Sequence, residues 1–283
     1  MTHTLALGLC ALLLAGRPAT AQTWRTLDAA AATTDSAPVT VRVEYTRGEL
    51  QTRPADRDGL LYDLHLRYDA ARARPLLAFD SAARSLAIGA QARPDTRART
   101  EGRASGDAVL QLGRGAALNL AVRLDVATAN LDFGGLSLRS LAVHASVSEA
   151  RVRFDTANAA RMETLDLDIS AATLTASGLA NARAARVRVA ARAGSAELDL
   201  GGAWERDMEL EIDITLATVT LYVPADVAIE LETTRRMLAT VDAGGLRRSG
   251  DLYVSTNSAT ATRKLRIRAG ATLGKLNVIH GSR

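Results

Sequence analysis

The stretch LAVRLDVATANLDF, residues 120–133, is followed by a near copy of itself, LAVHASVSEARVRF, residues 141–154. The copies are offset by 21 residues, six of their fourteen positions are identical, and their apolar residues fall at the same places. In both, apolar residues alternate with others, which is the pattern of β-strands with one buried face. The repeat predicts a chain assembled from similar pairs of short strands.

Related segments continue this series along the chain. The segments start at residues 120, 141, 165, 187 and 210, with spacings of 21, 24, 22 and 23 residues. A period of about 20 to 30 residues is typical of stacked units that cannot bury their apolar faces alone. The segment 228–246 fits next with a longer insertion, and RKLRIRAGATLGKLNV, residues 263–278, closes the series.

These observations predict an all-β protein built as a single-stack parallel β-solenoid, in which each strand bonds to its counterpart in the next repeat. Val122 is expected beside Val143, and Phe133 near Phe154. Small residues are expected at the corners of the coils: Ala129, Ala150, Ala171 and Ala196. The alternative is an antiparallel β-sandwich, but the repeats lack the Asn-Gly or Asp-Gly hairpin turns that favour one.

The chain divides into five predicted parts. Residues 1–21 form a signal peptide, 22–37 a flexible tether, 38–92 a small N-terminal β-unit, 93–107 a linker or exposed loop, and 108–283 the repeat domain. The tether is predicted because its residues are small and polar with no strand period.

The signal peptide is predicted from the eleven-residue apolar run Leu5–Ala15, which is too short to span a bilayer. Ala19 and Ala21 supply a small-x-small cleavage pattern, so we expect cleavage after Ala21 and an exported, periplasmic or extracellular protein without a membrane span. Cys10 is the only cysteine and leaves with the signal peptide. The mature chain is therefore expected to contain no disulfide and no thiolate metal site.

Composition narrows the function classes. Of the 283 residues, 47% are hydrophobic and only 4% are aromatic, so the core must consist mainly of aliphatic residues. The formal charge is +4, and the arginines are interleaved with acidic residues instead of forming a basic stripe. This pattern disfavours nucleic-acid binding.

The sequence shows no catalytic constellation. His65 and His144 are expected to face outward, His280 lies near the C-terminus, and no histidine pair has metal-ligand spacing. We therefore expect no catalytic residues, no metal site and no cofactor. Trp204 follows a glycine pair and is expected to fill a gap in the core, with an exposed binding anchor as the alternative.

Acidic residues offer one alternative to this expectation. Asp125, Asp168 and Asp213 could lie together on an outer face, where they would bind calcium or line a groove that cleaves glycans. The favoured interpretation is a solvated face on which basic neighbours offset their charge, namely Arg123, Arg153 and Arg188.

Two regions resemble the bacterial toast-rack proteins and the related C-terminal domain of LiaF-type cell-wall-active antibiotic response proteins. VRVEYTRGELQTRPADRDGLLYDLHLRYD, residues 41–69, with RPLLAFD, residues 74–80, is similar to the family's N-terminal unit. TLYVPADVAIEL, residues 220–231, with residues 263–278, is similar to its closing segment. The resemblance implies an extracytoplasmic β-solenoid of largely unassigned role. LiaF-type proteins restrain a sensor kinase from the membrane, whereas this chain has a cleavable leader in place of membrane helices.

The leading hypothesis is a non-enzymatic, exported binding or scaffold module of the cell envelope, with an envelope protein or glycan as partner. Two alternatives are a soluble regulator of envelope-stress signalling and an adhesin-like or carbohydrate-binding solenoid. We also expect self-association at the C-terminal edge, because LNVIH, residues 276–280, is followed by only three residues that could cap it.

Overall fold

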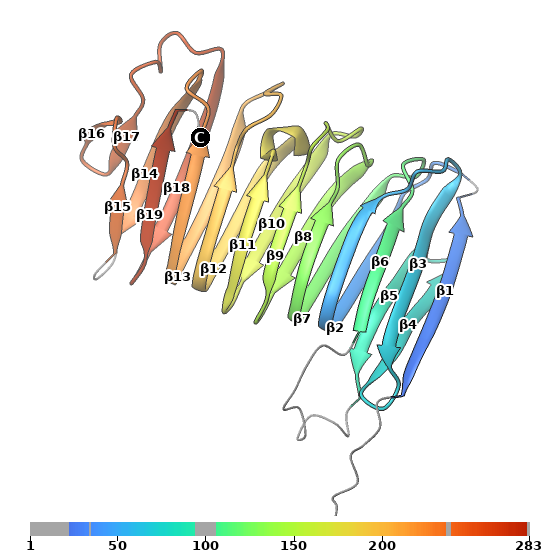
Figure 1. The fold of residues 1–283 in the computed structure, drawn as a ribbon. Helices are drawn as coiled ribbons and strands as arrows, with labels where there is room; N and C mark the ends of the chain where they lie inside the picture. Colours follow the sequence, from blue (N-terminus) through green and yellow to red (C-terminus); the bar gives the residue numbers. More distant parts are fainter. Residues whose placement is uncertain (1–22, 34, 94–105, 236–238, 282–283) are drawn as a thin grey trace, which may run out of the picture.

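The computed structural model describes residues 23–33, 35–93, 106–235 and 239–281, so the predicted signal peptide lies outside the described residues. The prediction of an all-β protein is confirmed: the described residues form nineteen strands and one short 3-10 helix, Leu179–Ala182. Figure 1 shows the strands stacked side by side along one axis. Within the described residues no helix is long and apolar enough to cross a membrane.

Each repeat contributes two strand segments joined by a corner. Strand β7 (Leu118–Asp132) carries both segments of one repeat, and β8 (Leu138–Ala145) and β9 (Glu149–Arg153) carry those of the next. Residues 118–124 pair in parallel with β8, and residues 128–132 pair in parallel with β9. The first segments of successive repeats form a ladder that we call row A, and the second segments form row B.

Row A runs in spatial order through β14 (Val227–Arg235), β18 (Arg263–Ala271), β13 (Met208–Val223), β12 (Ala184–Asp199), β10 (Met162–Ile169), β8, β7, β2 (Val39–Pro54), β5 (Ser85–Ala92) and β4 (Ala73–Asp80). Row B runs through β15 (Thr240–Asp242), β19 (Lys275–His280), β13, β12, β11 (Ala172–Ser177), β9, β7, β2, β6 (Gly106–Leu112), β3 (Leu60–Asp69) and β1 (Trp24–Ala32). Strands β16 (Arg247–Ser249) and β17 (Leu252–Val254) form a hairpin beside β14.

The predicted register between repeats is confirmed. Leu141 pairs with Leu120 on one side and Leu165 on the other, and Val187 continues the same ladder to Leu210. The pairing is parallel throughout this region, as stacked repeats require and an antiparallel sandwich does not.

The core lies between the two rows and consists of the inward members of the alternating strands. Val122 pairs with Val143 as predicted, and the rings of Phe133 and Phe154 are 6.0 Å apart between centroids. These four side chains are at most 2% exposed. The same apolar cluster continues from the N-terminal strands to the last strand, so one core serves the whole stack.

The predicted corner positions are mostly wrong. Ala129, Ala150 and Ala196 are buried strand residues of row B, at most 1% exposed, and of the four only Ala171 lies at a corner. The crowded position near Ala196 is instead Gly194, where a Cβ would lie 2.0 Å from the carbonyl oxygen of Ala172.

The predicted tether is also wrong. Residues 24–32 form β1, an antiparallel edge strand in which Ala29 pairs with Leu64 of β3. Leu27, Ala29 and Ala31 pack against the core. The alanine run carries no strand period, so its conformation is set by the backbone hydrogen bonds that β3 offers.

The boundary between an N-terminal unit and a repeat domain is not present in the pairing. Strand β2 pairs with β5 and β6 on one side and with β7 on the other. Of the predicted linker, residues 106 and 107 already belong to β6, while residues 94–105 lie outside the described residues.

At the C-terminal end, spatial order departs from sequence order. Strands β18 and β19 insert between β13 and the pair β14 and β15, which come earlier in the chain. The segment 276–280 therefore pairs with β13 along one side, and Leu276 and Asn277 are also flanked by β15. The predicted open edge at LNVIH is thus partly covered by the chain itself, because β14 and β15 take the outermost place.

Candidate interaction surface

Apolar residues form an exposed line along the corners of the stack. We call this line the corner rib; its members in spatial order are Val126, Val147, Ala171, Ala193, Leu216 and Leu273. Backbone hydrogen bonds hold neighbouring corners in step: the amides of Val147, Ala171 and Leu273 donate to the carbonyls of Asp125, Ser146 and Thr215, at 2.7, 2.8 and 2.9 Å. Ala193 pairs directly with Leu216.

The large members of the corner rib are unusually exposed for aliphatic residues. Val126 is 41%, Val147 59%, Leu216 61% and Leu273 42% exposed. Because neighbouring strands are about 4.8 Å apart, the rib extends over about 24 Å. Ala171 and Ala193, in the middle of the rib, have smaller side chains than the valines and leucines at its two ends, so the rib projects less in the middle.

The backbone is crowded directly after the rib residue at two corners of the stack. The residue after each rib member is small, and at Gly194 and Gly274 there is no room for a side chain. A Cβ at Gly194 would lie 2.0 Å from the carbonyl oxygen of Ala172, and one at Gly274 would lie 2.2 Å from Cγ2 of Ile214. At these two corners neighbouring repeats therefore approach so closely that only glycine fits after the rib residue.

Polar groups border the rib. A shallow groove beside Val126 and Val147 is lined by Arg47, Glu49 and Glu149. The hydroxyl of Ser148 donates to the carbonyl of Asp125 at 3.1 Å and so fixes one corner. Charged side chains therefore border the apolar rib at the end formed by Val126 and Val147.

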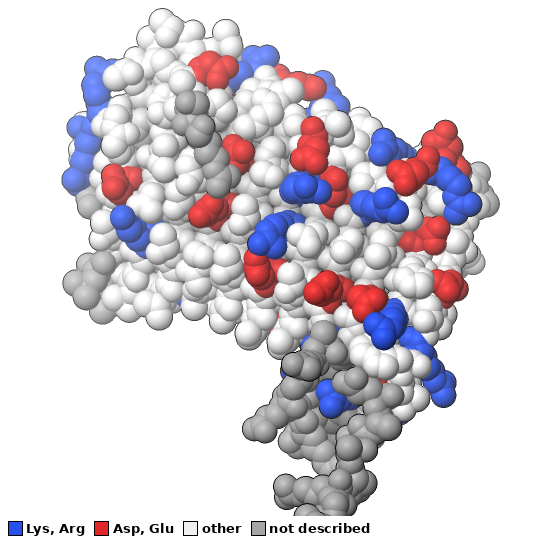
Figure 2. All heavy atoms as spheres, in the orientation of Figure 1, with Lys and Arg blue, Asp and Glu red and all other residues white. Residues whose placement is uncertain are grey.

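The outer face of row A has a different character, because its charges are largely paired across strands. Arg188 lies 3.6 Å from Asp166 and 3.2 Å from Glu211 in the two flanking strands. Arg266 lies 3.6 Å from Glu230. Basic and acidic side chains are also interspersed on the face drawn in Figure 2, which is the side of the molecule on which β1, β3 and β6 lie in front in Figure 1.

The three aspartates named from the sequence do not form one cluster. Asp168 forms a two-pronged ion pair with Arg192, at 2.8 and 3.2 Å, and its Oδ2 lies 3.2 Å from Nδ1 of His144. Asp213 shares the cross-strand row of Asp168, but Ala190 lies between them. Asp125 lies at a corner, 3.6 Å from Arg123.

Asp213 borders a second groove, of about 550 Å³, on the outer face near the C-terminal end. Gly270 leaves space here between Asp213 and Thr234, and Glu211, Glu232 and Arg268 form the sides. The described residues include no group of three or more His, Cys, Asp and Glu side chains placed to hold a metal ion.

His65 and His144 face outward as predicted, and His280, for which no direction was predicted, also has a partner. His65 projects outward, with Nδ1 2.5 Å from Oδ1 of Asp28 in β1. His280 donates from Nε2 to the carbonyl of Val227 at 2.9 Å, which ties the last strand to β14.

Trp204 is half-buried and packs against the core, as the favoured interpretation expected. Its Nε1 donates to the carbonyl of Leu200 at 2.8 Å, and Arg263 donates to its own carbonyl at 3.0 Å. A hollow of about 140 Å³ beside it is lined by Arg183 and Arg206, among other residues. Both guanidinium groups donate hydrogen bonds to backbone carbonyls of neighbouring loops and so hold these loops together.

Two buried tyrosines have shifted acidity. Burial, with a smaller contribution from the charges of Asp107 and Glu49, raises the pKa of Tyr45 far above its usual value. Burial also raises the pKa of Tyr62. Both hydroxyls therefore stay protonated at ordinary pH and are poor candidates for proton transfer.

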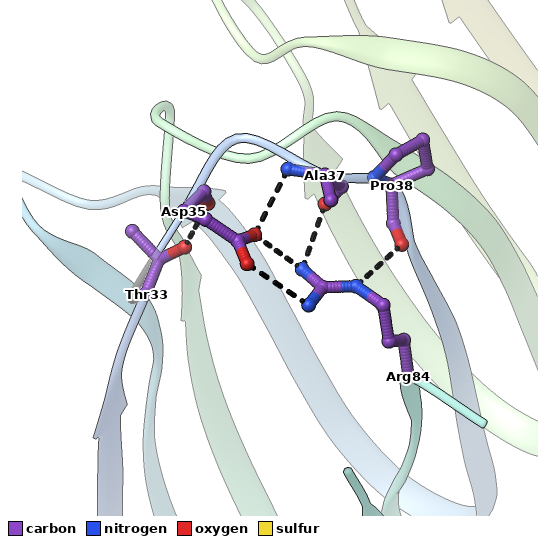
Figure 3. Close-up of polar contacts among 5 residues, drawn as sticks. All are labelled: Thr33, Asp35, Ala37, Pro38 and Arg84. Atoms are coloured by element: carbon purple, nitrogen blue, oxygen red, sulfur yellow. Dashed lines mark hydrogen bonds and ion pairs between the residues drawn. The ribbon is translucent and has the colours of Figure 1, made fainter. Parts of the chain in front are cut away.

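An ion pair between Asp35 and Arg84 links the loop between β1 and β2 to the turn between β4 and β5 (Figure 3), and we call it the latch. Arg84 pairs with both carboxylate oxygens of Asp35, at 2.6 and 3.2 Å, and donates to the carbonyls of Ala37 and Pro38. The carboxylate also accepts the amide of Ala37 at 2.9 Å. This backbone hydrogen bond, followed by the Arg84 contact, lowers the pKa of Asp35.

The corner rib was missed from the sequence, although a signal was present. The residue six positions after each repeat start is apolar in every repeat: positions 126, 147, 171, 193 and 216 follow the starts at 120, 141, 165, 187 and 210. Strand periodicity does not distinguish an outward apolar residue at a corner from an inward one in a strand.

Comparisons with known proteins give no family. No family model matches the sequence, and no curated protein matches it. One similar solved structure is described as "a putative cell adhesion protein" from Clostridium sporogenes; it is 10% identical, with 90% of this chain and 99% of that chain covered and a TM-score of 0.43. Another, "a putative adhesin" from Bacteroides fragilis, is 10% identical, with 92% and 98% covered and the same TM-score. At these values neither structure assigns a function, and the resemblance to toast-rack and LiaF-type proteins stays a prediction.

Proposed function

We propose that this protein is an exported, non-enzymatic binding or scaffold module of the cell envelope, and that the corner rib is the surface on which its partner docks. The observation that carries the proposal is the alignment of exposed aliphatic side chains along successive corners. Contiguous exposed apolar surface of this kind marks interaction sites in soluble proteins.

The chemistry of the rib favours a protein as the partner over a glycan. Its exposed members are aliphatic, whereas sugar rings stack best on aromatic faces, and this chain is only 4% aromatic. The charged margin at Arg47, Glu49 and Glu149 would supply the polar rim of such an interface.

The proposal of a non-enzymatic role is supported by the ion pairs of two of the three candidate acids, Asp125 and Asp168. Asp168 is engaged by Arg192 and His144, and the ladder around Arg188 alternates in charge. A carboxylate that acts as a general acid needs a raised pKa and an open approach, and a carboxylate in an ion pair is poorly placed for that role.

We further propose that the stack is a β-solenoid in which each repeat adds one coil. The constant parallel register and the single core support this interpretation. Deletion of residues 141–164, which would bring Leu165 into the place of Leu141, should leave a folded protein with a cooperative unfolding transition. Loss of folding would favour an architecture whose repeats are not interchangeable.

The docking surface can be tested by site-specific photo-crosslinking in the native envelope. A photoreactive residue at Leu216 should give a discrete adduct with one envelope protein, and Val147→Glu in the same chain should abolish it. A photoreactive residue at Arg151, exposed on row B, serves as the matched control and should give none. Equal labelling from both positions, or an adduct insensitive to Val147→Glu, would contradict the assignment.

Export is tested separately by N-terminal sequencing of the protein recovered from the cell envelope or medium. The expected first residue is Gln22. An uncleaved chain retained in the cytoplasm would refute this part of the proposal.

A further inference from the structure

Strand β4 is an edge of the sheet at the N-terminal end of the stack (Figure 1). Among the described residues its only ladder partner is β5, which lies antiparallel on one side. Leu77 is 38% and Phe79 51% exposed. An unpaired edge with exposed apolar side chains is a template for another strand.

The hydrogen-bond pattern shows which backbone groups of β4 face away from β5. The amide of Arg93 donates to the carbonyl of Arg72 at 2.8 Å, and Ala73 pairs with Ala92. In an antiparallel ladder this places every second residue from position 72 toward β5. Pro75, Leu77 and Phe79 therefore direct their backbone groups outward.

Pro75 occupies one of these outward positions, so its missing N–H weakens no bond to β5. The amides and carbonyls of Leu77 and Phe79 and the carbonyl of Pro75 remain available on the open side. The edge therefore lacks a backbone donor at Pro75 but presents both an amide and a carbonyl at Leu77 and at Phe79.

We propose that a second copy of this chain pairs with β4 as an antiparallel strand, with Leu77 on the two-fold axis. In this register the Leu77 amide of each copy donates to the Leu77 carbonyl of the other. The Phe79 amide of each copy donates to the Pro75 carbonyl opposite it, while the Phe79 carbonyl has no N–H opposite it, because proline lacks one. This register therefore gives four backbone hydrogen bonds across the two-fold axis, two between the Leu77 residues and two from Phe79 to Pro75.

The side chains fit the same register. Arg74 of each copy lies opposite Asp80 of the other, and Phe79 lies opposite Pro75. Arg74 and Asp80 form non-hydrogen-bonded pairs across the new interface, in which side chains approach most closely. The apolar contacts thus lie at and beside the two-fold axis, and the two charge pairs flank them symmetrically.

The other edge strand at this end is less suited to self-pairing. Asp28 lies at the centre of β1, so a two-fold pairing about that centre would place two carboxylates opposite each other. The latch between Asp35 and Arg84 fixes the turn that follows β4, which keeps the β4 edge ordered for pairing.

A charge swap tests the pairing. In sedimentation-velocity experiments over a range of concentrations the wild-type chain is expected to form a weak dimer. Arg74→Glu alone, and Asp80→Lys alone, should each weaken it by about ten-fold or more, because both charge pairs become repulsive. An equimolar mixture of the two variants should restore dimerisation, since both charge pairs in the heterodimer are attractive.

Two further variants keep the test decisive. Leu77→Pro removes an outward amide and should give a monomer that unfolds like the wild type. Val147→Lys, on the corner rib, should leave the dimer unchanged and so separates this interface from the proposed docking surface. Asp80 also accepts the amide of Ala83 at 2.9 Å, so unfolding of Asp80→Lys must be checked first. A wild-type monomer at submillimolar concentration, or a dimer unaffected by Arg74→Glu and Leu77→Pro, would overturn the proposal.

Discussion

The rings of Phe133 and Phe154 lie 6.0 Å apart with their planes tilted by 50°, although 21 residues separate them in the sequence. They occupy equivalent places in successive repeats, and both are at most 1% exposed. In a core made chiefly of aliphatic side chains, this contact joins the ends of two neighbouring repeats.

Replacement of Phe154 by alanine should therefore be severely destabilising. We expect the free energy of unfolding to fall by about 3 to 5 kcal/mol, because a fully buried ring is lost and the parallel neighbours cannot close the cavity. Urea unfolding followed by circular dichroism measures the change. Phe79→Ala, at a half-exposed ring, is the matched control and should cost less than about 1 kcal/mol in dilute solution. Equal effects at both sites would contradict the assigned core.

Asn158 is fully buried in the loop after β9 and should be the most sensitive polar side chain in that loop. Its Oδ1 accepts the amide of Leu138 at 2.8 Å, and its Nδ2 donates to the carbonyls of Leu138 and Ala160 at 2.7 and 2.9 Å. Asn158→Ala leaves buried backbone groups unsatisfied and should cost about 2 to 4 kcal/mol in urea unfolding. Asn130→Ala, at an exposed position, should change stability by less than about 0.5 kcal/mol.

Gly194 should not tolerate a side chain. Its φ of +100° is unfavourable for L-residues, and a Cβ would lie 2.0 Å from the carbonyl oxygen of Ala172. Gly194→Ala is expected to lower the melting temperature markedly, by an amount corresponding to at least about 2 kcal/mol. Gly115→Ala, where the nearest atom is an ordinary 3.5 Å away, should be near neutral. A neutral Gly194→Ala would mean that the corner is looser than described.

The latch predicts a pH dependence at the acidic end of the range. Hydrogen bonds from the Ala37 amide and from Arg84 lower the pKa of Asp35 below its usual value. Because the folded-state pKa lies below the unfolded one, the latch stabilises the fold above the unfolded value, and its contribution is lost as the pH falls through the folded value. The stability difference between wild type and Asp35→Asn should be constant above about pH 5 and should shrink below about pH 4. A stability difference that does not shrink on acidification would contradict the role given to the latch.

Several features of the fold were predictable from local patterns. Alternation in residues 120–133 and 141–154 predicted the strand faces, and their offset of 21 residues predicted the register that pairs Val122 with Val143. Strand β1 was not predictable, because an alanine-rich edge has no periodicity and takes its conformation from β3. The sequence shows an apolar residue six positions after each repeat start. That these residues form an exposed line became clear only from the structure, which places them at the corners of the stack.

The sequence by itself determined that this is an all-β chain of stacked repeats and which side chains face the core, because burial of one strand face imposes a period of two and stacking imposes a period near 22. Only the tertiary structure decided the spatial order of the strands at the C-terminal end, where β18 and β19 insert between β13 and the β14–β15 pair. Segments with the same alternation and the same apolar face do not show by pattern alone which of them will be neighbours. The choice among them depends on loop length and on contacts such as that between His280 and Val227, which no local pattern records.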